Sequence, residues 1–375
     1  MLLANFYFWY FAAVSIFIAF FNIYVKHLGF SSFEISVLAS LHPLARVLWP
    51  PFWGHLADRS GRRDRVAAAV NLTATAVFGA YFFADRFLTL FIVQLVFTFF
   101  WSTVLPLMEA TSLEQASLGR IDYGRSRMWG SVGFILASLA IGPLLDRLGI
   151  SFALWTILGC LFLSSFSTLF TPRPEIIHSP QPGSLRIFLG RPEVKLFFFV
   201  GMLCQLSHAT MYNFLSIHLE TVGYSNNLIG ALWAFGVICE VPVIRWSTRL
   251  IDRFGRLHLM TFALFMATIR WLIMSVTTAY PLLLFAQGMH AITFGMFHVA
   301  AVTHAFALAP PHLRARGQAL YSGLSFGVGI SIGMLVNGAV YDTVGAGACF
   351  AGSAVVALAA ALLSLKLHEK PAAPA

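Results

Sequence analysis

Charged side chains are scarce in this sequence. Only 10% of its 375 residues are Asp, Glu, Lys or Arg, against about 25% in a typical soluble domain. A soluble protein with so few charges could not cover its apolar interior with polar surface. The composition therefore excludes a cytosolic enzyme, a secreted module and a disordered tail.

Cysteine is also rare, and the usual motifs of metal and nucleophile chemistry are missing. The four cysteines, Cys160, Cys204, Cys239 and Cys349, lie in apolar runs without CxxC or Cys/His ligand spacing, so disulfides and zinc are not expected. The sequence has no HExxH, Walker or dinucleotide-binding pattern. The segment Gly323–Gly327 fits GxSxG, but it lies in an apolar helical run rather than at a strand-to-helix turn. We expect no enzyme, no cofactor and no metal site.

Apolar residues fill the space that charges leave. They make up 58% of the chain, with 37 phenylalanines, and the mean hydropathy is +0.79. One membrane-spanning helix with its loop takes about 30 residues, so the chain has room for roughly a dozen spans. Lipid offers the backbone no hydrogen-bond partner, so each span should be a helix. The apolar runs predict spans near residues 2–25, 33–53, 66–84, 87–108, 127–145, 151–170, 195–218, 227–247, 257–276, 281–305, 318–341 and 347–366.

The positive charge is explained by membrane topology. The net charge is +9, and most basic residues fall in alternate loops, whereas the opposite loops carry only Lys26, Arg86 and Arg147. Basic loops stay in the cytoplasm, so we expect both termini there, in a multi-pass protein of the inner (plasma) membrane, and no nucleic-acid partner. The first apolar run is longer than a signal peptide core and is read as a retained span. We expect a monomer.

The chain contains two related halves. Three segments recur at offsets of 194, 194 and 196 residues, which indicates a duplication. The pairs are Gly29-Phe30-Ser31 with Gly223-Tyr224-Ser225, Asp58-Arg59-Ser60-Gly61-Arg62 with Asp252-Arg253-Phe254-Gly255-Arg256, and Gly142-x3-Asp146-x2-Gly149 with Gly338-x3-Asp342-x2-Gly345. Each half has an even number of spans, so the two copies run in the same direction. Parallel repeats of this kind suit alternating access to a site between them.

A proline-rich stretch separates the halves. Residues 171–194 hold five prolines and form the longest loop. We therefore expect an N-terminal six-helix bundle at residues 1–170, a cytoplasmic linker at 171–194 and a C-terminal six-helix bundle at 195–375.

Two segments resemble a known family. The ten residues from Gly54 to Arg63, GHLADRSGRR, are similar to the loop signature of the major facilitator superfamily between its second and third spans. Residues 122–131, DYGRSRMWGS, resemble the fifth-span entry of phenylpropionate-permease-like transporters, which are relatives of the lactose permease (oligosaccharide/proton symporter) group. The resemblance implies an all-α membrane protein with twelve transmembrane helices in two pseudo-symmetric six-helix bundles.

The chain departs from the lactose permeases at two positions. Thr293 stands where they carry a carboxylate, one helical turn after the tenth-span histidine, and Thr248 replaces the first glycine of the loop signature in the second half. The proton route of the sugar permeases therefore cannot be transferred whole.

A charge inside the bilayer costs at least about 2.5–3.5 kcal/mol on insertion scales, so the few charges in spans are candidates for function. Arg46, Glu240 and Arg270 lie within the second, eighth and ninth spans. Arg46 and Glu240 are also equivalent in the duplication. They either pair across the two halves or belong to separate ion pairs within each half.

Glu109 and Arg127 are 18 residues apart, across a short cytoplasmic turn. In the lactose permease group, a carboxylate and an arginine at this place hold the substrate. The alternative is an interfacial pair that anchors two helix ends. Trp101 shares a helical face with Glu109, so this face could line a cavity.

The tenth span carries Gln287, His290 and His298 on one face, with His304 expected at the membrane interface outside it. Histidine titrates near neutral pH and can carry a proton, although a membrane histidine can also be a packing residue. The seventh span repeats this pattern with Gln205, His208 and Tyr212.

These observations predict a secondary transporter that couples uptake of a small organic anion, such as an aromatic carboxylate, to protons. In this interpretation, protonation of Glu240 frees Arg270 to bind the substrate. Desolvation raises the pKa of a carboxyl group, whereas pairing with an arginine lowers it. A sugar or nucleoside symporter, an efflux pump and a non-transporting receptor remain alternatives. The expected substrate-binding residues are Glu109, Arg127, Trp101, Gln205, His208, Tyr212, Arg270 and Gln287. The expected proton-coupling residues are Glu240, His290 and His298. The expected gating residues are Gly54, Asp58, Arg59, Gly61, Arg62, Asp252, Arg253, Gly255 and Arg256.

Overall fold

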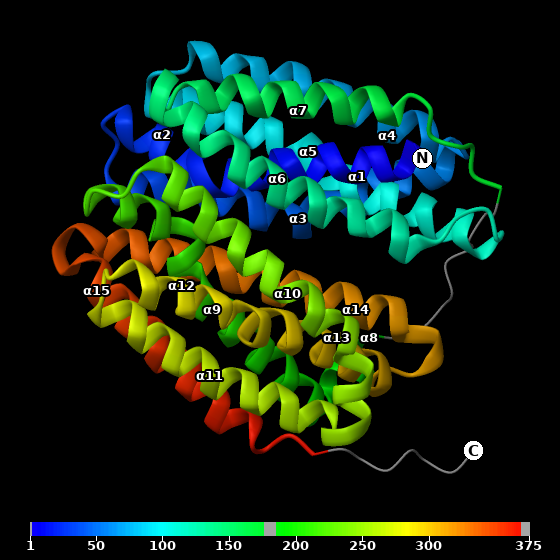
Figure 1. The fold of residues 1–375 in the computed structure, drawn as a ribbon. Helices are drawn as coiled ribbons and strands as arrows, with labels where there is room; N and C mark the ends of the chain where they lie inside the picture. The colour runs from blue at the N-terminus through cyan, green and yellow to red at the C-terminus, as the bar shows by residue number, and fades with distance from the viewer. Residues whose placement is uncertain (1, 176–184, 369–375) are drawn as a thin grey trace. The chain divides into compact units, whose positions relative to one another are not determined.

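The computed structural model describes residues 2–175 and 185–368, and these residues form helices joined by short loops, with no strand among them (Figure 1). The all-α prediction is therefore confirmed for the described part of the chain. The first half comprises α1 (Leu2–Ile16), η1 (Phe17–Phe21), α2 (Asn22–His27), α3 (Ser32–Ser60), α4 (Arg63–Phe78), η2 (Gly79–Phe83), α5 (Phe87–Ser117), α6 (Tyr123–Leu148) and α7 (Phe152–Thr168). The second half comprises α8 (Leu185–Gly190), α9 (Pro192–Thr221), α10 (Asn226–Phe254), α11 (Arg256–Val276), α12 (Tyr280–Gly288), η3 (Ala291–Met296), α13 (Phe297–Leu308), η4 (Pro311–Leu313), α14 (Arg314–Ser322), η5 (Gly323–Gly329) and α15 (Ile330–Ser364).

Nine helices of the described residues are long and apolar enough to cross a membrane. The longest, Arg316–Ser364, contains a non-helical residue at Gly345 and therefore consists of two helical segments. The helix α3 is 29 residues long but contains three prolines, and α7 is apolar but has only 17 residues. Counting α3, α7 and the second segment after Gly345 gives twelve helical segments in the described residues.

Glycines with positive φ end helices at matching places in the two halves. Glycine adopts a positive φ at little cost. Two equivalent helix-to-helix turns use a positive φ at Gly61 (φ 61°) and Gly255 (φ 76°), although their ψ angles differ (14° and 147°). The other matched pairs are Gly29 with Gly223 and Gly149 with Gly345. The pairs follow the sequence offsets of 194 and 196, so the duplication extends to the positions of the glycines with positive φ.

The helix contacts divide the chain into two compact units. Unit 1 is Met1–Ser179 with Tyr212–Ala234, and unit 2 is Pro180–Met211 with Phe235–Ala375. The helices α9 and α10 therefore contribute to both units. The division of the sequence at residues 171–194 stays a prediction.

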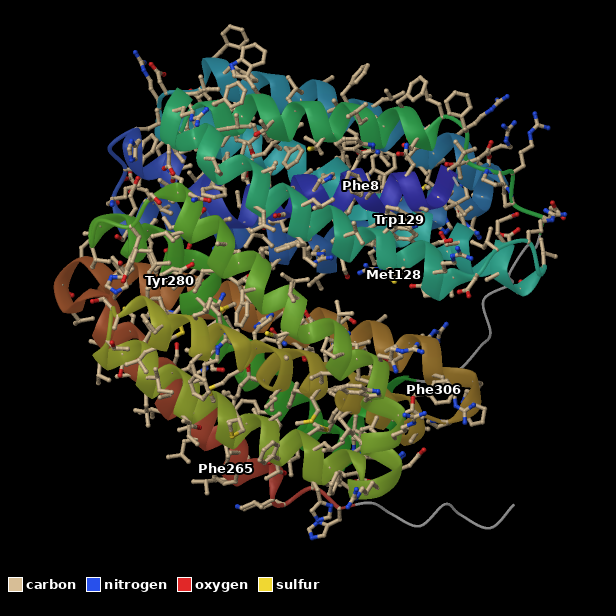
Figure 2. The ribbon with its side chains drawn as sticks, in the orientation of Figure 1. Phe8, Met128, Trp129, Phe265, Tyr280 and Phe306 are labelled. Atoms are coloured by element: carbon tan, nitrogen blue, oxygen red, sulfur yellow. The ribbon has the colours of Figure 1, made fainter. Side chains whose placement is uncertain are left out.

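In unit 1, α1 packs against α6 and α7, and α5 packs against α3 and α4. Phe8 of α1 and Trp129 of α6 lie side by side, with ring centroids 6.4 Å apart (Figure 2). Glycine makes this approach close, because a Cβ on Gly133 would collide with the backbone carbonyl of Phe8. The paired helices thus depend on a missing side chain, as close-packed membrane helices often do.

Unit 1 also holds the Tyr212–Ala234 segment through polar contacts. The carboxylate of Asp146, near the end of α6, accepts hydrogen bonds from the backbone N–H of Asn226 (2.8 Å) and Asn227 (3.1 Å). These are unsatisfied donors at the first turn of α10, and the negative charge suits the positive end of the helix dipole. Lys26 pairs with Glu220 at 3.2 Å.

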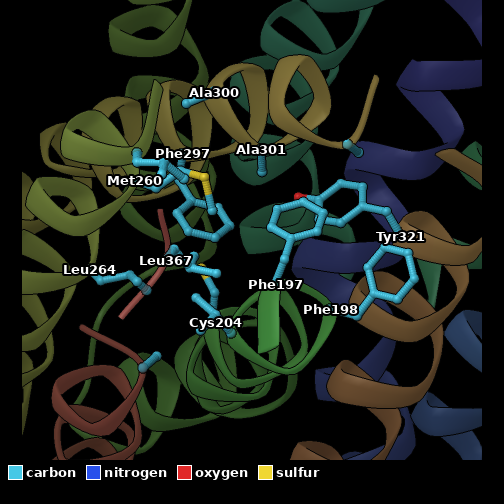
Figure 3. Close-up of a cluster of buried hydrophobic side chains, with 14 of the residues drawn as sticks. Phe197, Phe198, Cys204, Met260, Leu264, Phe297, Ala300, Ala301, Tyr321 and Leu367 are labelled. Carbon is cyan, nitrogen blue, oxygen red and sulfur yellow. The ribbon is translucent and has the colours of Figure 1, made fainter. Parts of the chain in front are cut away.

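Unit 2 has its own apolar core, in which α11 packs against α15 and α13. Figure 3 shows part of it, with Phe197 of α9 beside Tyr321 of α14 and with Phe297 and Met260 close by. The rings of Phe197 and Tyr321 are stacked with centroids 5.5 Å apart. This core fixes α9, α11 and α13 around the polar side chains described next.

Candidate functional site

A buried arginine lies at the centre of a polar cluster in unit 2. The side chain of Arg270 on α11 is 0% exposed. Its Nη1 atom donates to Thr293 Oγ1 at 2.9 Å and contacts His290 Nδ1 at 3.1 Å. Its Nη2 atom donates to Gln287 Oε1 at 2.5 Å and contacts Met211 Sδ at 2.9 Å. The guanidinium is thus held in one position by side chains from three helical segments.

The contact with His290 defines which ring nitrogen is protonated. A guanidinium has no acceptor, so Arg270 donates and Nδ1 of His290 accepts. Nδ1 therefore carries no proton in this arrangement. A proton can bind to Nδ1 of His290 only after the hydrogen bond from Arg270 is broken. The charged ring would then repel the guanidinium.

His208 extends the cluster onto α9. Its Nδ1 lies 2.8 Å from the carbonyl oxygen of Cys204. A carbonyl only accepts, so Nδ1 is the donor and Nε2 is the atom with a free lone pair. The ring is buried, lies 6.3 Å from that of His290 and packs edge-on against Trp271 at 4.9 Å.

A π-helical segment shapes the tenth span. The residues Ala291–Met296 form η3, and such bulges are frequent at functional sites. The rings of His290, Phe294 and His298 stack in a row, with centroid distances of 4.8 and 6.0 Å. Glu240 of α10 packs on the same segment, because a Cβ on Gly295 would come within 2.8 Å of Glu240 Cγ. Two of the residues expected to couple protons, His290 and His298, therefore flank η3, and the third, Glu240, contacts it from α10.

Unit 1 contains a second charged cluster. Glu109 on α5 and Arg127 on α6 form an ion pair with 3.6 Å between Oε1 and Nε, and each side chain is about one-third exposed. The Arg127 guanidinium lies 4.1 Å from the ring centroid of Phe11 and 5.6 Å from that of Tyr7. Stacking on an aromatic ring keeps the edge of a guanidinium available for a carboxylate.

Aromatic side chains surround the interior end of this cluster. Trp101 is 1% exposed, and its ring centroid lies 5.5 Å from Tyr10 and 5.0 Å from His42. Tyr10 lies within the electrostatic influence of Arg46, Glu109 and Arg127. The pairing of Arg46 with Glu240 stays a prediction, because these residues belong to different units.

The expected gating loop forms a network that the sequence only partly predicted. Arg62 pairs with Asp64 inside its own turn at 2.8 Å. Its neighbour Arg63 instead bonds the buried Glu114 of α5 at 2.9 Å and lies 4.0 Å from Asp58. Glu114 also accepts a hydrogen bond from the backbone N–H of Glu175 at 2.5 Å.

This network joins α4, α5 and the first residues after α7. Sequence reasoning missed Glu114 because a single carboxylate at the end of an apolar helix gives no sign of its partner.

The other expected gating residues lie in the same two turns. Gly54, near the end of α3, has open space around it, and Arg59 is exposed. In the second half, Gly255 also has a positive φ, but its ψ of 147° differs from the 14° of Gly61, and the Arg253 guanidinium lies 5.2 Å from the ring of Phe254. The roles of these residues, and of Asp252 and Arg256, remain predictions.

The expected substrate residues are divided between the two units. Gln205, His208, Arg270 and Gln287 lie in unit 2, whereas Glu109, Arg127, Trp101 and Tyr212 lie in unit 1. Tyr212 stacks on Trp233 with centroids 6.2 Å apart. His304 is only 4% exposed and packs against Phe197, and its expected place at the membrane interface stays a prediction.

The chain is similar to a known protein family and to named transporters. The MFS_1 like family model matches residues 1–351. The chain is 31% identical over 377 residues to the Probable 3-phenylpropionic acid transporter of Escherichia coli (strain K12), with 96% of each chain covered. It is 25% identical over 346 residues to the Maltose permease of Geobacillus stearothermophilus, covering 91% of this chain and 87% of the relative.

A solved structure of nucleoside transporter NupG superposes with a TM-score of 0.87 at 18% identity, and the match covers 98% of this chain and 99% of that one. At this level of identity, the likeness shows the fold alone. It is the fold that the sequence resemblance implied.

Proposed function

Because this chain belongs to the MFS_1 like family and is a transporter of the major facilitator superfamily, we propose that it takes up a small aromatic carboxylate together with protons. The proposed substrate class is that of 3-phenylpropionate, which the 31% identical relative carries in its name. The proposed setting is the inner membrane, with both termini in the cytoplasm and a single copy of the chain as the working unit.

The observation that carries this proposal is the pair of fixed guanidinium groups. Arg127 stacks on Phe11 beside Glu109, and Arg270 is held by Gln287 and Thr293. Arginine binds carboxylates through two parallel hydrogen bonds, with a geometry that lysine does not match. Tyr7 and Phe11 lie beside Arg127, and the rings of Tyr10 and Trp101 continue from Phe11 at 5.4 and 5.5 Å. Aromatic faces of this kind suit a phenyl ring.

Proton coupling is proposed through Arg270, His290 and Glu240. A proton on His290 Nδ1 displaces the guanidinium and frees its N–H groups for the substrate carboxylate. Release of the substrate lets Arg270 return, and the proton leaves. Glu240, which packs on the same segment, contributes a second protonation site. Each ligand then favours one conformation of the transporter, and this shared preference is what couples them.

A neutral hydroxylated substrate is the second candidate. Glu109 is an acceptor with about one-third of its side chain exposed, and carboxylates bind sugar hydroxyls well. The 25% identical relative is named as a maltose permease. Under this alternative, Glu109 rather than Arg127 would hold the substrate.

The test compares ligands that differ in one property. Purified protein is heated with 3-phenylpropionate, with its uncharged amide and with maltose, and the unfolding temperature is measured. Ligand binding to the folded state raises that temperature. We expect a rise with the carboxylate only. A rise with maltose, or an equal rise with the acid and the amide, would overturn the anion proposal.

A further inference from the structure

Unit 2 contains buried polar atoms that form no hydrogen bond with any described residue. They come from five side chains that are at most 4% exposed. The atoms are Gln205 Nε2, Gln205 Oε1, His208 Nε2, His304 Nδ1, Tyr321 Oη and Ser325 Oγ. A buried polar group without a partner costs about 1–3 kcal/mol, and such groups usually bond ordered water.

These side chains and the aromatic rings between them form one column. The ring of Phe294 lies 4.8 Å from His290 and 6.2 Å from His208 at one end. It also lies 6.0 Å from Phe326, which in turn is 6.2 Å from Tyr321.

The column continues to His304. The ring of Phe197 stacks on Tyr321 at 5.5 Å (Figure 3). The same ring lies 4.9 Å from His304. No step between neighbouring rings exceeds 6.3 Å.

Between the His290 end and the His304 end of the column, unbonded atoms lie where α9 meets η5. A Cβ on Gly201 would come within 2.7 Å of Ser325 Oγ, so α9 and the π-helix η5 are in contact there. Gln205 lies one helical turn after Gly201 and therefore on the same face of α9. Tyr321 lies one turn before Ser325. The unbonded atoms of these three residues thus belong to one contact region.

We propose that water molecules occupy this column and carry protons between the Arg270–His290 cluster and His304. Water is the ligand that suits groups with both donors and acceptors, such as the amide of Gln205 and the hydroxyls of Ser325 and Tyr321. The route runs inside unit 2 and is separate from the Glu109–Arg127 cluster of unit 1.

The charged groups around the column are consistent with this role. Arg270 and Glu240 lie at the His290 end, from α11 and α10. Arg256 of α11 acts electrostatically on His304 at the other end, and His298 lies beside Phe326 at 5.4 Å. Charged groups thus lie at both ends of the column. That the column carries protons rests on the proton coupling proposed above. That the column holds water does not depend on it.

The first experiment detects the water directly. X-ray irradiation splits bound water into hydroxyl radicals that label the adjacent side chains, and mass spectrometry measures the rate. Tyr321 and Phe297 are both 0% exposed and belong to the same core, but only Tyr321 carries an unbonded polar atom, so Phe297 serves as the matched control. We expect Tyr321 to be labelled several-fold faster than Phe297 after correction for intrinsic reactivity. Equal, slow labelling would overturn the proposal.

The second experiment tests the proton route in vesicles. Tyr321→Phe and Ser325→Ala remove only hydroxyl groups, and Tyr341→Phe, outside the column, is the control. Tyr321→Phe and Ser325→Ala should lose most of the accumulation of 3-phenylpropionate that a pH gradient drives. They should keep the exchange of labelled for unlabelled substrate, because exchange needs no net proton transfer. Accumulation equal to wild type would overturn the route. If the wild-type protein moves no 3-phenylpropionate in either mode, the proposed function fails, and the labelling experiment still decides whether water is present.

Discussion

At the residue scale, the account depends on which atom holds the proton. Arg270 can only donate, so its 3.1 Å contact requires an unprotonated Nδ1 on His290. A titratable ring that bonds the guanidinium only when neutral is suited to exchange a proton for a substrate. Glutamine keeps an acceptor for Arg270 but does not titrate.

We therefore expect His290→Gln to bind 3-phenylpropionate normally and to lose pH-driven accumulation. His258→Gln, at an exposed position on α11, is the control and should behave as wild type. The measurements are the unfolding temperature with ligand and the initial rate of uptake at a fixed pH gradient. Unimpaired pH-driven accumulation in His290→Gln would show that another group carries the proton.

Arg127 provides a test of substrate contact. Lysine keeps the charge but loses the paired hydrogen bonds and the stacking on Phe11. Arg127→Lys should raise the KM for uptake roughly tenfold, a loss of about 1.4 kcal/mol of binding free energy. Its unfolding temperature should stay near that of wild type, because partly exposed pairs such as Glu109–Arg127 contribute about 0–1 kcal/mol.

Arg125→Lys is the matched control, since Arg125 lies two residues away on the same helix and is exposed. A KM unchanged in both variants would place the substrate elsewhere.

Residue spacing predicted part of the candidate site. Gln287 and His290 do share one cluster with Arg270, as their common helical face suggested. The π-helical segment η3 was not predicted from the sequence, because helical spacing assumes 100° per residue and a π-helix has a wider turn. An added residue in a turn rotates everything after it, and no composition signal marks such a bulge.

At the scale of helices, close approaches at glycine set the packing. A Cβ on Gly142 of α6 would lie 2.6 Å from the carbonyl oxygen of Asn226. Backbone atoms cannot yield as a flexible side chain can. Gly142→Ala should therefore separate α6 from the start of α10 and destabilise unit 1 by about 1–3 kcal/mol.

Gly159→Ala is the control for helix propensity. Gly159 has nothing within 4 Å of the added methyl group, so the change should stabilise α7 by roughly 0.5–1 kcal/mol. Unfolding temperatures of both variants, measured in the same detergent, check the prediction. A rise for both would mean that α6 and α10 separate at no cost.

The Arg63–Glu114 contact offers a second test at this scale. The side chain of Glu114 is 2% exposed and that of Arg63 is 12% exposed. Breaking such a pair leaves a buried charge uncompensated, at a cost of about 3 kcal/mol. Arg63→Gln should therefore lower the unfolding temperature more than Arg62→Gln does, since Arg62 pairs only within its own turn in a more exposed position. The reverse order would contradict this assignment of the network.

For the whole molecule, the repeated sequence segments were the most informative signal. Their offsets recur in the positive φ angles of Gly61 and Gly255, and apolar run length predicted most helix positions. The sharing of α9 and α10 between the two units was not predictable, because it depends on contacts such as Asp146 with Asn226 that join distant parts of the sequence. Local sequence patterns predict where each helix lies in the chain, whereas long-range contacts decide which unit each helix packs into.

The central claim is that substrate and proton cross the membrane together. The direct measurement is uptake of labelled 3-phenylpropionate into sealed vesicles with and without an inward proton gradient. Protein-free vesicles are the control, because a weak acid distributes across a pH gradient on its own. The account predicts a gradient-dependent uptake rate well above that control, which a protonophore abolishes and His290→Gln lacks. An uptake rate that the gradient does not change, or that equals the rate of protein-free vesicles, would contradict it.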